Sequence, residues 1–205
     1  MIHLHNMDCM EAMAQMPDNA FELAICDPPY GAIEHMQSGG GKTKMKQLMH
    51  WDKKPSKKYF EQLQRVSRYQ IIFGGNYFCD YLPISNCWFI WHKGKQLRFP
   101  EFEMAWTNTK KPNNVFYMSR ADANINKITY KKFHPTAKPK ELYMYLLNKY
   151  AKKGWRILDT HLGSGSSAIA AYNAGYEFVG YEIDTDYYNA AKKRFENHKR
   201  QIRMF

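Results

Sequence analysis

Short apolar segments alternate with amphipathic ones along this chain, and this alternation constrains its fold more than any other feature. FELAIC at 21–26 and FVGYE at 178–182 have the length of strands, whereas apolar residues recur at helical spacing within 57–68. Strands that alternate with helices build a mostly parallel sheet with helices on both faces. We therefore expect an α/β fold with strands at 2–4, 21–26, 69–73, 87–91, 103–107, 156–159 and 178–182, and helices at 9–15, 57–68, 140–150, 167–173 and 186–199.

The chain is expected to form one domain over residues 1–205. This length suits a single core, and neither an internal repeat nor a low-complexity linker divides it. Two stretches lack strand or helix patterning. Residues 31–56, with three glycines at 39–41, predict a mobile loop, and residues 108–133 are polar, basic and weakly patterned.

Positive charge predominates and is clustered. Thirty lysine and arginine residues stand against 19 acidic residues, which gives a formal net charge of +11. Residues 31–60, 101–140 and 192–205 hold seven, eight and six basic residues against two, three and one acidic residues. Clustered positive charge attracts polyanions, so nucleic acid is the expected partner; ordinary solvated lysines are the alternative.

The cysteines and the apolar segments indicate a cellular compartment. Cys9, Cys26, Cys79 and Cys87 show no C-x-x-C spacing, so we expect neither a disulfide framework nor a zinc site. No apolar run approaches the roughly 18 residues needed to cross a bilayer, and the N-terminus lacks the features of a signal peptide. We therefore expect a cytoplasmic protein that binds neither a membrane nor a metal.

A glycine-rich turn follows the strand expected at 156–159. Residues 163–166 (GSGS) lie between Asp159 and the next helix, and such a turn lets backbone N–H groups approach a ligand closely. Glu182 ends the following strand, where a carboxylate can accept hydrogen bonds from ribose hydroxyls. The pattern predicts a dinucleotide or S-adenosylmethionine as cofactor, with a tight turn that binds no ligand as the alternative.

Asp27-Pro28-Pro29-Tyr30 ends the strand expected at 21–26, at a position where ligands bind in open α/β sheets. The exocyclic amine of a nucleobase is a poor nucleophile because its lone pair is delocalised into the ring. The Asp27 carboxylate and the Pro28 carbonyl can each accept a hydrogen bond from one N–H group of the amine, which frees its lone pair. Pro29 stiffens the backbone that holds them. The Tyr30 ring offers a flat face for a base taken out of the duplex. The tetrapeptide therefore suits methylation of a base amine; a strand-ending turn is the alternative.

These segments together resemble the amino-methyltransferases of DNA, in the permuted motif order of their β group. In that order the Asp-Pro-Pro-Tyr motif comes first and the cofactor motifs follow. HPTAKP at 134–139 is similar to a family segment that precedes the cofactor strand, and ILDTHLGSGSS at 157–167 is similar to the cofactor turn. NMDCMEAM, which contains Asp8, and FGGNY at 73–77 also resemble family motifs. The resemblance covers nearly the whole chain.

The resemblance implies a Rossmann-like methyltransferase fold with a mostly parallel seven-stranded sheet. It implies transfer of a methyl group from S-adenosylmethionine to N6 of an adenine that is flipped out of double-stranded DNA. Asp27, Pro28, Pro29 and Tyr30 would form the catalytic site. The residues implied to bind the cofactor are Asp8, Cys9, Asp27, His134, Thr136, Lys138, Asp159, His161, Gly163, Ser164, Gly165, Ser166 and Glu182.

Basic and aromatic residues occur together around the two weakly patterned stretches. Lysines neutralise phosphates and aromatic rings hold displaced bases, although such rings more often belong to a core. Trp51, Trp106, Phe116 and Tyr117 are the aromatic candidates. The residues expected to bind DNA are Lys42, Lys44, Lys46, Trp51, Lys53, Lys54, Lys110, Lys111 and Arg120.

Two features depart from the family pattern. Thr160 and His161 stand where the family usually has Pro and Phe, so the imidazole is expected to stack at the cofactor or to tune the pocket with pH. Residues 108–133 are too few for a separate recognition domain. We therefore expect loose or short sequence specificity, or recognition shared between the two protomers of a homodimer.

The residues leave other functions open. Aspartate at position 27 favours adenine, because N4-cytosine members of the family usually carry serine there. An N4-cytosine methyltransferase is the nearest alternative, followed by a DNA-binding protein with a decayed cofactor site and by an RNA methyltransferase. A bacterial restriction–modification system and a solitary enzyme in a phage-infected cell both fit the sequence.

Overall fold

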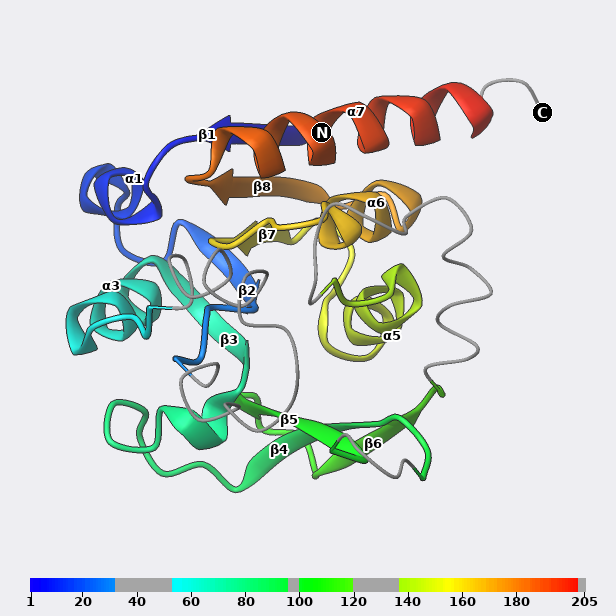
Figure 1. The fold of residues 1–205 in the computed structure, drawn as a ribbon. Helices are drawn as coiled ribbons and strands as arrows, with labels where there is room; N and C mark the ends of the chain where they lie inside the picture. Colours follow the sequence, from blue (N-terminus) through cyan, green and yellow to red (C-terminus); the bar gives the residue numbers. More distant parts are fainter. Residues whose placement is uncertain (32–52, 96–99, 120–136, 203–205) are drawn as a thin grey trace, which may run out of the picture.

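The computed structural model describes residues 1–31, 53–95, 100–119 and 137–202, which form one sheet with helices on both faces (Figure 1). Within these residues the sheet has eight strands in the order β1-β8-β7-β2-β3-β5-β4-β6. Their bounds are β1 Ile2–Asn6, β2 Phe21–Cys26, β3 Ser67–Phe73, β4 Cys87–His92, β5 Phe102–Thr107, β6 Asn114–Tyr117, β7 Arg156–Asp159 and β8 Glu177–Glu182.

Strand direction brings many strand ends together at one edge of the sheet. The neighbouring strands β1, β8, β7, β2 and β3 run parallel, so their carboxyl ends meet at this edge, which we call the carboxyl edge. β5 runs antiparallel to both β3 and β4, so the beginning of β5 and the end of β4 reach the same edge. Ligands bind at the carboxyl edge in open α/β folds.

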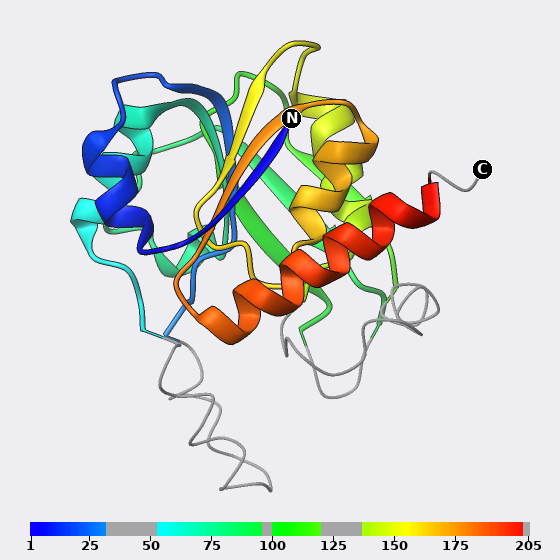
Figure 2. The ribbon, with the colours of Figure 1, turned by 90° about the horizontal axis from the view of Figure 1, so that it is seen from above.

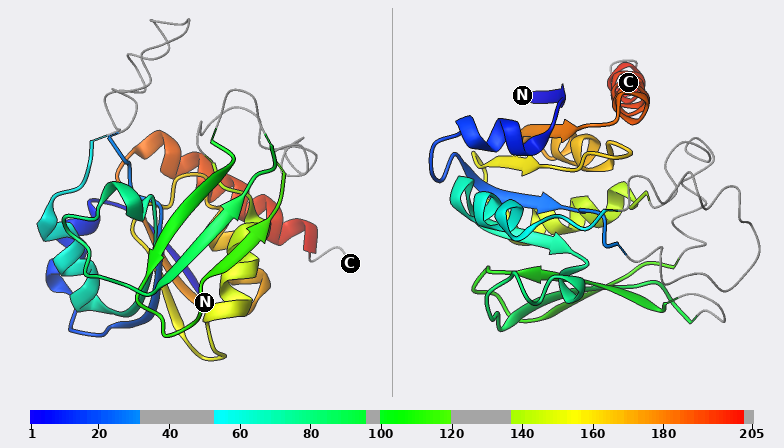
Figure 3. Two further views of the ribbon diagram at one scale, coloured as in Figure 1. Left: turned by 90° about the horizontal axis from the view of Figure 1, so that it is seen from below. Right: turned by 60° about the vertical axis from the view of Figure 1, so that its left-hand side comes forward.

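Helices pack on both faces of the sheet, as predicted. Figure 2 shows α1 and α3 against one face and α5, α6 and α7 against the other. In Figure 3, α7 lies at one end of the sheet, and β5, β4 and β6 form the opposite end. The bounds are α1 Cys9–Gln15, α3 Lys57–Val66, α5 Lys140–Tyr150, α6 Ser166–Asn173 and α7 Thr185–Ile202, with a short 3-10 helix, η2, at Gly75–Tyr77.

Alternate side chains of β2 enter two apolar clusters, one on each face of the sheet. Leu23 and Ile25 pack in the cluster that includes residues of α5 and α6, and Ala24 and Cys26 in the cluster that includes α1 and α3. Complete burial of a side chain such as Leu23 stabilises the fold by about 1.5–3 kcal/mol. β2 therefore lies fixed in the centre of the molecule, and the residues that follow it start from a rigid position.

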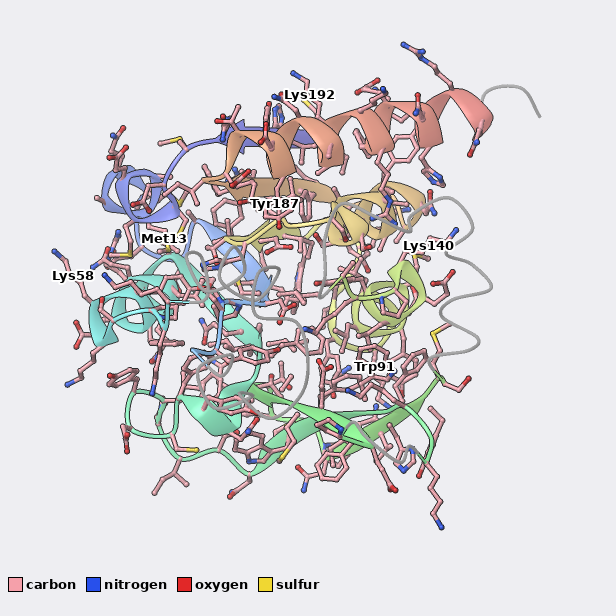
Figure 4. All side chains as sticks on the ribbon, in the orientation of Figure 1. Met13, Lys58, Trp91, Lys140, Tyr187 and Lys192 are labelled. Carbon is pink, nitrogen blue, oxygen red and sulfur yellow. The ribbon has the colours of Figure 1, made fainter. Side chains whose placement is uncertain are left out.

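The outer faces of the helices carry charge. Figure 4 shows Lys58 on α3 and Lys192 on α7 pointing away from the sheet, in agreement with their exposure. Within the described residues no helix combines the length and the apolar character that crossing a membrane requires.

The prediction of a seven-stranded sheet is wrong, because β6 adds an eighth strand. β6 lies inside the weakly patterned stretch 108–133, for which no strand was predicted, and it pairs in parallel with β4 from Asn114 to Tyr117. Its four residues, NVFY, are too few for an alternating pattern that would predict a strand. The helix expected at 57–68 ends at Val66, because Ser67 joins β3 and its hydroxyl donates to the Leu63 carbonyl.

Candidate active site

The Asp-Pro-Pro-Tyr segment begins where β2 ends, at the carboxyl edge. The Asp27 Oδ1 atom accepts a hydrogen bond of 2.7 Å from the Tyr30 hydroxyl. The Lys138 Nζ atom, just before α5, lies 2.5 Å from Asp27 Oδ2. The side chain of Asp27 is 16% exposed, so this carboxylate is held from two sides and still reachable from solvent. Pro28 is buried beside it.

The Tyr30 ring is packed between two parts of the FGGNY segment. It stacks on Tyr77 with ring centroids 5.1 Å apart and planes at 14°. At Gly74 a Cβ atom would lie 2.3 Å from the ring, so the ring rests directly on the glycine. Tyr77 is 45% exposed and forms the solvent-facing member of the pair. The sequence singled out this segment without giving Tyr77 a place in the site.

We expect Gly74→Ala to lower the methyl transfer that the family resemblance implies, by displacing Tyr30. Gly74 has φ +67°, which costs a non-glycine residue roughly 1–2 kcal/mol, and the added methyl group would also collide with the ring. Gly175→Ala is the matched control, because Gly175 has φ +75° and a Cβ atom there would meet nothing within 4 Å. Melting temperatures and kcat check this: both variants should lose stability, but only Gly74→Ala should lose activity. Equal kcat in the two variants would contradict the expectation.

The Lys138 ammonium lies among three acceptors. Besides Asp27, it lies 3.3 Å from the Glu103 Oε2 atom and donates to the Tyr30 hydroxyl at 3.2 Å. An ammonium has three N–H bonds, so this set matches its donors. Burial alone would lower the pKa of Lys138, but Asp27 and Glu103 outweigh burial and raise it above its ordinary value. Lys138 therefore stays charged.

Glu103 and Lys93 continue this charged cluster, and sequence reasoning missed both. The Lys93 Nζ atom lies 2.9 Å from the Glu103 Oε1 atom, and its side chain is only 2% exposed. Burial would raise the pKa of Glu103, but the ammonium groups of Lys138 and Lys93 outweigh it and lower the pKa. No local motif marks either residue. Glu103 pairs with Trp91 across β4 and β5, and the Lys93 N–H donates to the Glu101 carbonyl, so only this pairing places both residues at the carboxyl edge.

The glycine turn after β7 is built around two carboxylates. Asp159 is fully buried and accepts hydrogen bonds from the Ser167 hydroxyl at 2.6 Å and the His161 N–H at 3.0 Å. Glu182, at the end of β8, accepts from the Gly163 N–H at 2.8 Å. The turn needs left-handed backbone at Gly163 and Gly165, with φ +49° and +72°. The structure thus brings these predicted cofactor residues together.

The surroundings of Asp159 disfavour its negative charge. Burial above all, together with the charges of Asp27 and Glu182, raises the pKa of Asp159 to about 7, against the hydrogen bonds from Ser167 and His161. The negative charges of Asp27 and Glu182 thus add to burial in disfavouring the ionised form of Asp159.

His161 lies in a chain of polar contacts behind the turn. The Thr160 Oγ1 atom is 3.0 Å from His161 Nδ1 and 2.6 Å from the Tyr59 hydroxyl. The Tyr59 ring also meets the imidazole edge-on at 5.3 Å. Burial lowers the pKa of His161 to about 4, so the imidazole is neutral at physiological pH.

Asp159 and His161 should give opposite dependences of stability on pH in the cofactor-free protein. The folded pKa of Asp159 is raised, so its protonation stabilises the fold as pH falls from about 7 towards 4, by on the order of 4 kcal/mol. The folded pKa of His161 is lowered, so stability is lost as pH falls from about 6.5 to 4.

Urea unfolding of Asp159→Asn and His161→Phe at several pH values tests this opposition. Relative to the unmodified chain, Asp159→Asn should lose stability on acidification and His161→Phe should gain it. Parallel curves for all three proteins would show that neither group titrates in this way.

The remaining described cofactor candidates have structural partners. Asp8 caps α1 by accepting a hydrogen bond from the Met10 N–H, and burial raises the pKa of the Cys9 thiol to about 12. The Ser164 and Ser166 hydroxyls lie 3.0 Å apart, and both residues are buried in the turn. Their roles in cofactor binding stay predictions. His134 and Thr136 lie outside the described residues.

The residues expected to bind DNA are only partly described. The Lys54 ammonium lies 4.7 Å from the ring centre of Tyr81, and Lys111 donates to the Lys149 carbonyl at the end of α5. Trp106 is wrong as a base-holding candidate, because it is buried in the core and its indole donates to the Pro83 carbonyl. Phe116 is partly buried, whereas three other candidates are exposed: Tyr117, Lys53 and Lys110. The remaining candidates lie outside the described residues: Lys42, Lys44, Lys46, Trp51 and Arg120.

Comparisons with known proteins fit this geometry. Residues 35–193 match the model of a family described as DNA methylase. The Type II methyltransferase M2.DpnII of Streptococcus pneumoniae is 36% identical over 63 residues, which are 31% of this chain and only 24% of that relative.

Two solved structures share the fold. The M1.HpyAVI–SAM complex has a TM-score of 0.64 at 20% identity and covers 95% of this chain and 100% of its own. The PvuII DNA methyltransferase, described as cytosine-N4-specific, has a TM-score of 0.64 at 12% identity and covers 98% of this chain and 92% of its own.

Proposed function

This chain belongs to the DNA methylase family, and from that membership we propose that it methylates N6 of adenine in double-stranded DNA with S-adenosylmethionine as the methyl donor. The observation that carries the proposal is the Asp27 carboxylate. It follows a central parallel strand, is held at the carboxyl edge by Tyr30 and Lys138, and remains partly accessible. An acceptor in this position suits a base amine that enters from solvent.

The cofactor would bind at the glycine turn. S-adenosylmethionine, when bound, supplies a methyl group on a positively charged sulfur. Glu182 would bind the ribose hydroxyls, and the backbone at Gly163 and Gly165 would line the pocket, because a glycine turn lets a ligand approach the main chain. The similar M1.HpyAVI structure is a complex with this cofactor, which supports the assignment.

Asp27 and Pro28 would act on the base amine. Each would accept a hydrogen bond from one of its two N–H groups, which frees the lone pair of N6 to form the new N–C bond. Positive charge that develops on N6 is then stabilised by the carboxylate of Asp27. The sulfur would leave with the electrons of the broken S–C bond, and N6 would then lose one proton to solvent. The exposed ring of Tyr77, stacked on Tyr30, would offer an incoming base an aromatic face.

The choice of adenine depends on Asp27 rather than on the fold. The PvuII enzyme has the same fold and is described as cytosine-N4-specific, so the architecture serves either base. Aspartate in the first position of the motif is the residue that our sequence analysis associates with adenine. DNA would lie along the basic stretches 31–56 and 108–133. Because residues 108–133 are too few for a separate recognition domain, we expect loose or short sequence specificity, or recognition shared by a homodimer.

Reciprocally blocked DNA tests the base assignment. One set of duplexes is amplified with N6-methyl-dATP in place of dATP, and a second with N4-methyl-dCTP in place of dCTP. With tritium-labelled S-adenosylmethionine, the second set should accept label as unblocked DNA does, and the first should accept little. Label in the first set alone would make the chain an N4-cytosine methyltransferase.

A further inference from the structure

Four ionised side chains form a row behind the Asp-Pro-Pro-Tyr segment, with alternating charge. Lys93 lies 2.9 Å from Glu103, Glu103 lies 3.3 Å from Lys138, and Lys138 lies 2.5 Å from Asp27. The two lysine side chains are at most 4% exposed, and Asp27 is the end of the row nearest the proposed substrate. The row therefore connects the proposed catalytic carboxylate to the β4–β5 hairpin.

Each member comes from a different segment of the chain. Asp27 follows β2, Glu103 lies near the start of β5, Lys93 follows β4, and Lys138 precedes α5. Glu103 pairs with Trp91 in the β4–β5 register, two residues before Lys93. The row therefore depends on the antiparallel reversal of β5, which turns its beginning towards the carboxyl edge.

Stability alone gives a weak reason for such a row. Burying ions costs several kcal/mol each, and apolar residues of similar size often stabilise a fold as well as a buried ion pair does. Two positive and two negative groups attract one another here, which offsets the free-energy cost of burying them. The net contribution to stability stays small. A row of this kind that ends on a proposed catalytic group suggests a role in the reaction.

Glu103 is the member that holds Lys138 from behind. Lys138 matches its three N–H bonds to Asp27, Glu103 and the Tyr30 hydroxyl. Without the Glu103 carboxylate, the Lys138 ammonium is no longer attracted to the side opposite Asp27. The ammonium and the Asp27 carboxylate can then change orientation together. Small misplacements of a reacting group can cost on the order of a hundredfold in rate.

We propose that Glu103 and Lys93 are positioning residues for methyl transfer, which hold the Lys138 ammonium against Asp27 and so fix the direction of the Asp27 carboxylate. The inference rests on the proposed role of Asp27. Neither residue touches the reacting atoms: Glu103 acts through Lys138, and Lys93 acts through Glu103.

The test compares three variants of the full chain with the unmodified protein. Glu103→Gln should lower kcat on unmethylated DNA by roughly ten- to a hundredfold while the Kd for S-adenosylmethionine stays within about twofold. Glu101→Gln is the matched control, because this exposed carboxylate lies in the same hairpin, and it should leave kcat unchanged. Melting temperatures are measured for every variant.

The double variant Lys93→Met/Glu103→Gln separates positioning from folding. Glu103→Gln alone leaves two buried ammonium groups with one carboxylate, whereas the double variant restores the balance between Lys138 and Asp27. We expect its melting temperature to recover and its kcat to stay low. If kcat recovers together with stability, or if Glu103→Gln retains full kcat, the positioning role is wrong although the proposed function stands. An unmodified chain that transfers no methyl group to DNA would overturn both.

Discussion

Replacing Asp27 by asparagine should reduce kcat for DNA methylation by on the order of a hundred- to a thousandfold. Asparagine keeps the size of the side chain and an oxygen that can accept from the Tyr30 hydroxyl, and Lys138 keeps Glu103 as a partner, so the fold should persist at reduced stability. It removes the negative charge that would stabilise positive charge on N6 during transfer. Binding of S-adenosylmethionine, measured by calorimetry, should change far less than kcat.

Asp18→Asn is the matched control for this variant. Asp18 is a 73% exposed carboxylate that pairs with Arg65 and precedes β2, at the opposite end of that strand. Its replacement should leave kcat unchanged, since surface ion pairs contribute little. If Asp27→Asn retained the kcat of the control, the carboxylate would have no part in the reaction and the site would have to lie elsewhere.

Replacing Lys138 by methionine should have the largest effect on stability. The variant leaves the carboxylates of Asp27 and Glu103 in the interior without the ammonium between them, which costs about 3–5 kcal/mol for a broken buried pair. Methyl transfer should fall as well, because Asp27 loses its partner. Urea unfolding and kcat measured on the same preparations give both quantities.

Lys140→Met provides the comparison, since Lys140 begins α5 only two residues later and is partly exposed (Figure 4). Its effect on the free energy of unfolding should stay below about 1 kcal/mol. Equal losses in the two variants would show that Lys138 contributes no more than a surface lysine, contrary to the charged cluster described above.

The ends of the parallel strands were predictable from the sequence. The apolar run 21–26, the double proline after it and the glycine turn after Asp159 are local patterns, and each marks a strand end by backbone chemistry alone. Because parallel strands share their carboxyl edge, these patterns were sufficient to bring Asp27, Asp159 and Glu182 together. In the structure β2, β7 and β8, which precede or carry these residues, are parallel neighbours.

The cluster of Lys93 and Glu103 could not be predicted in the same way. Neither residue lies in a local motif, and their meeting depends on the register and direction of β4 and β5. Tyr77 was missed for a similar reason, since its stacking on Tyr30 depends on the close approach of Gly74 to that ring. The burial of Trp106 in the core could not be predicted from the sequence either.

The most direct test of the central claim is the chemical identity of the product. Unmethylated DNA is incubated with S-adenosylmethionine and either the unmodified chain or Asp27→Asn, digested to nucleosides and analysed by mass spectrometry. We predict N6-methyl-2′-deoxyadenosine with the unmodified chain and almost none with the variant. N4-methyl-2′-deoxycytidine would preserve the mechanism and contradict the choice of base, and no methylated nucleoside on any DNA would contradict the account as a whole.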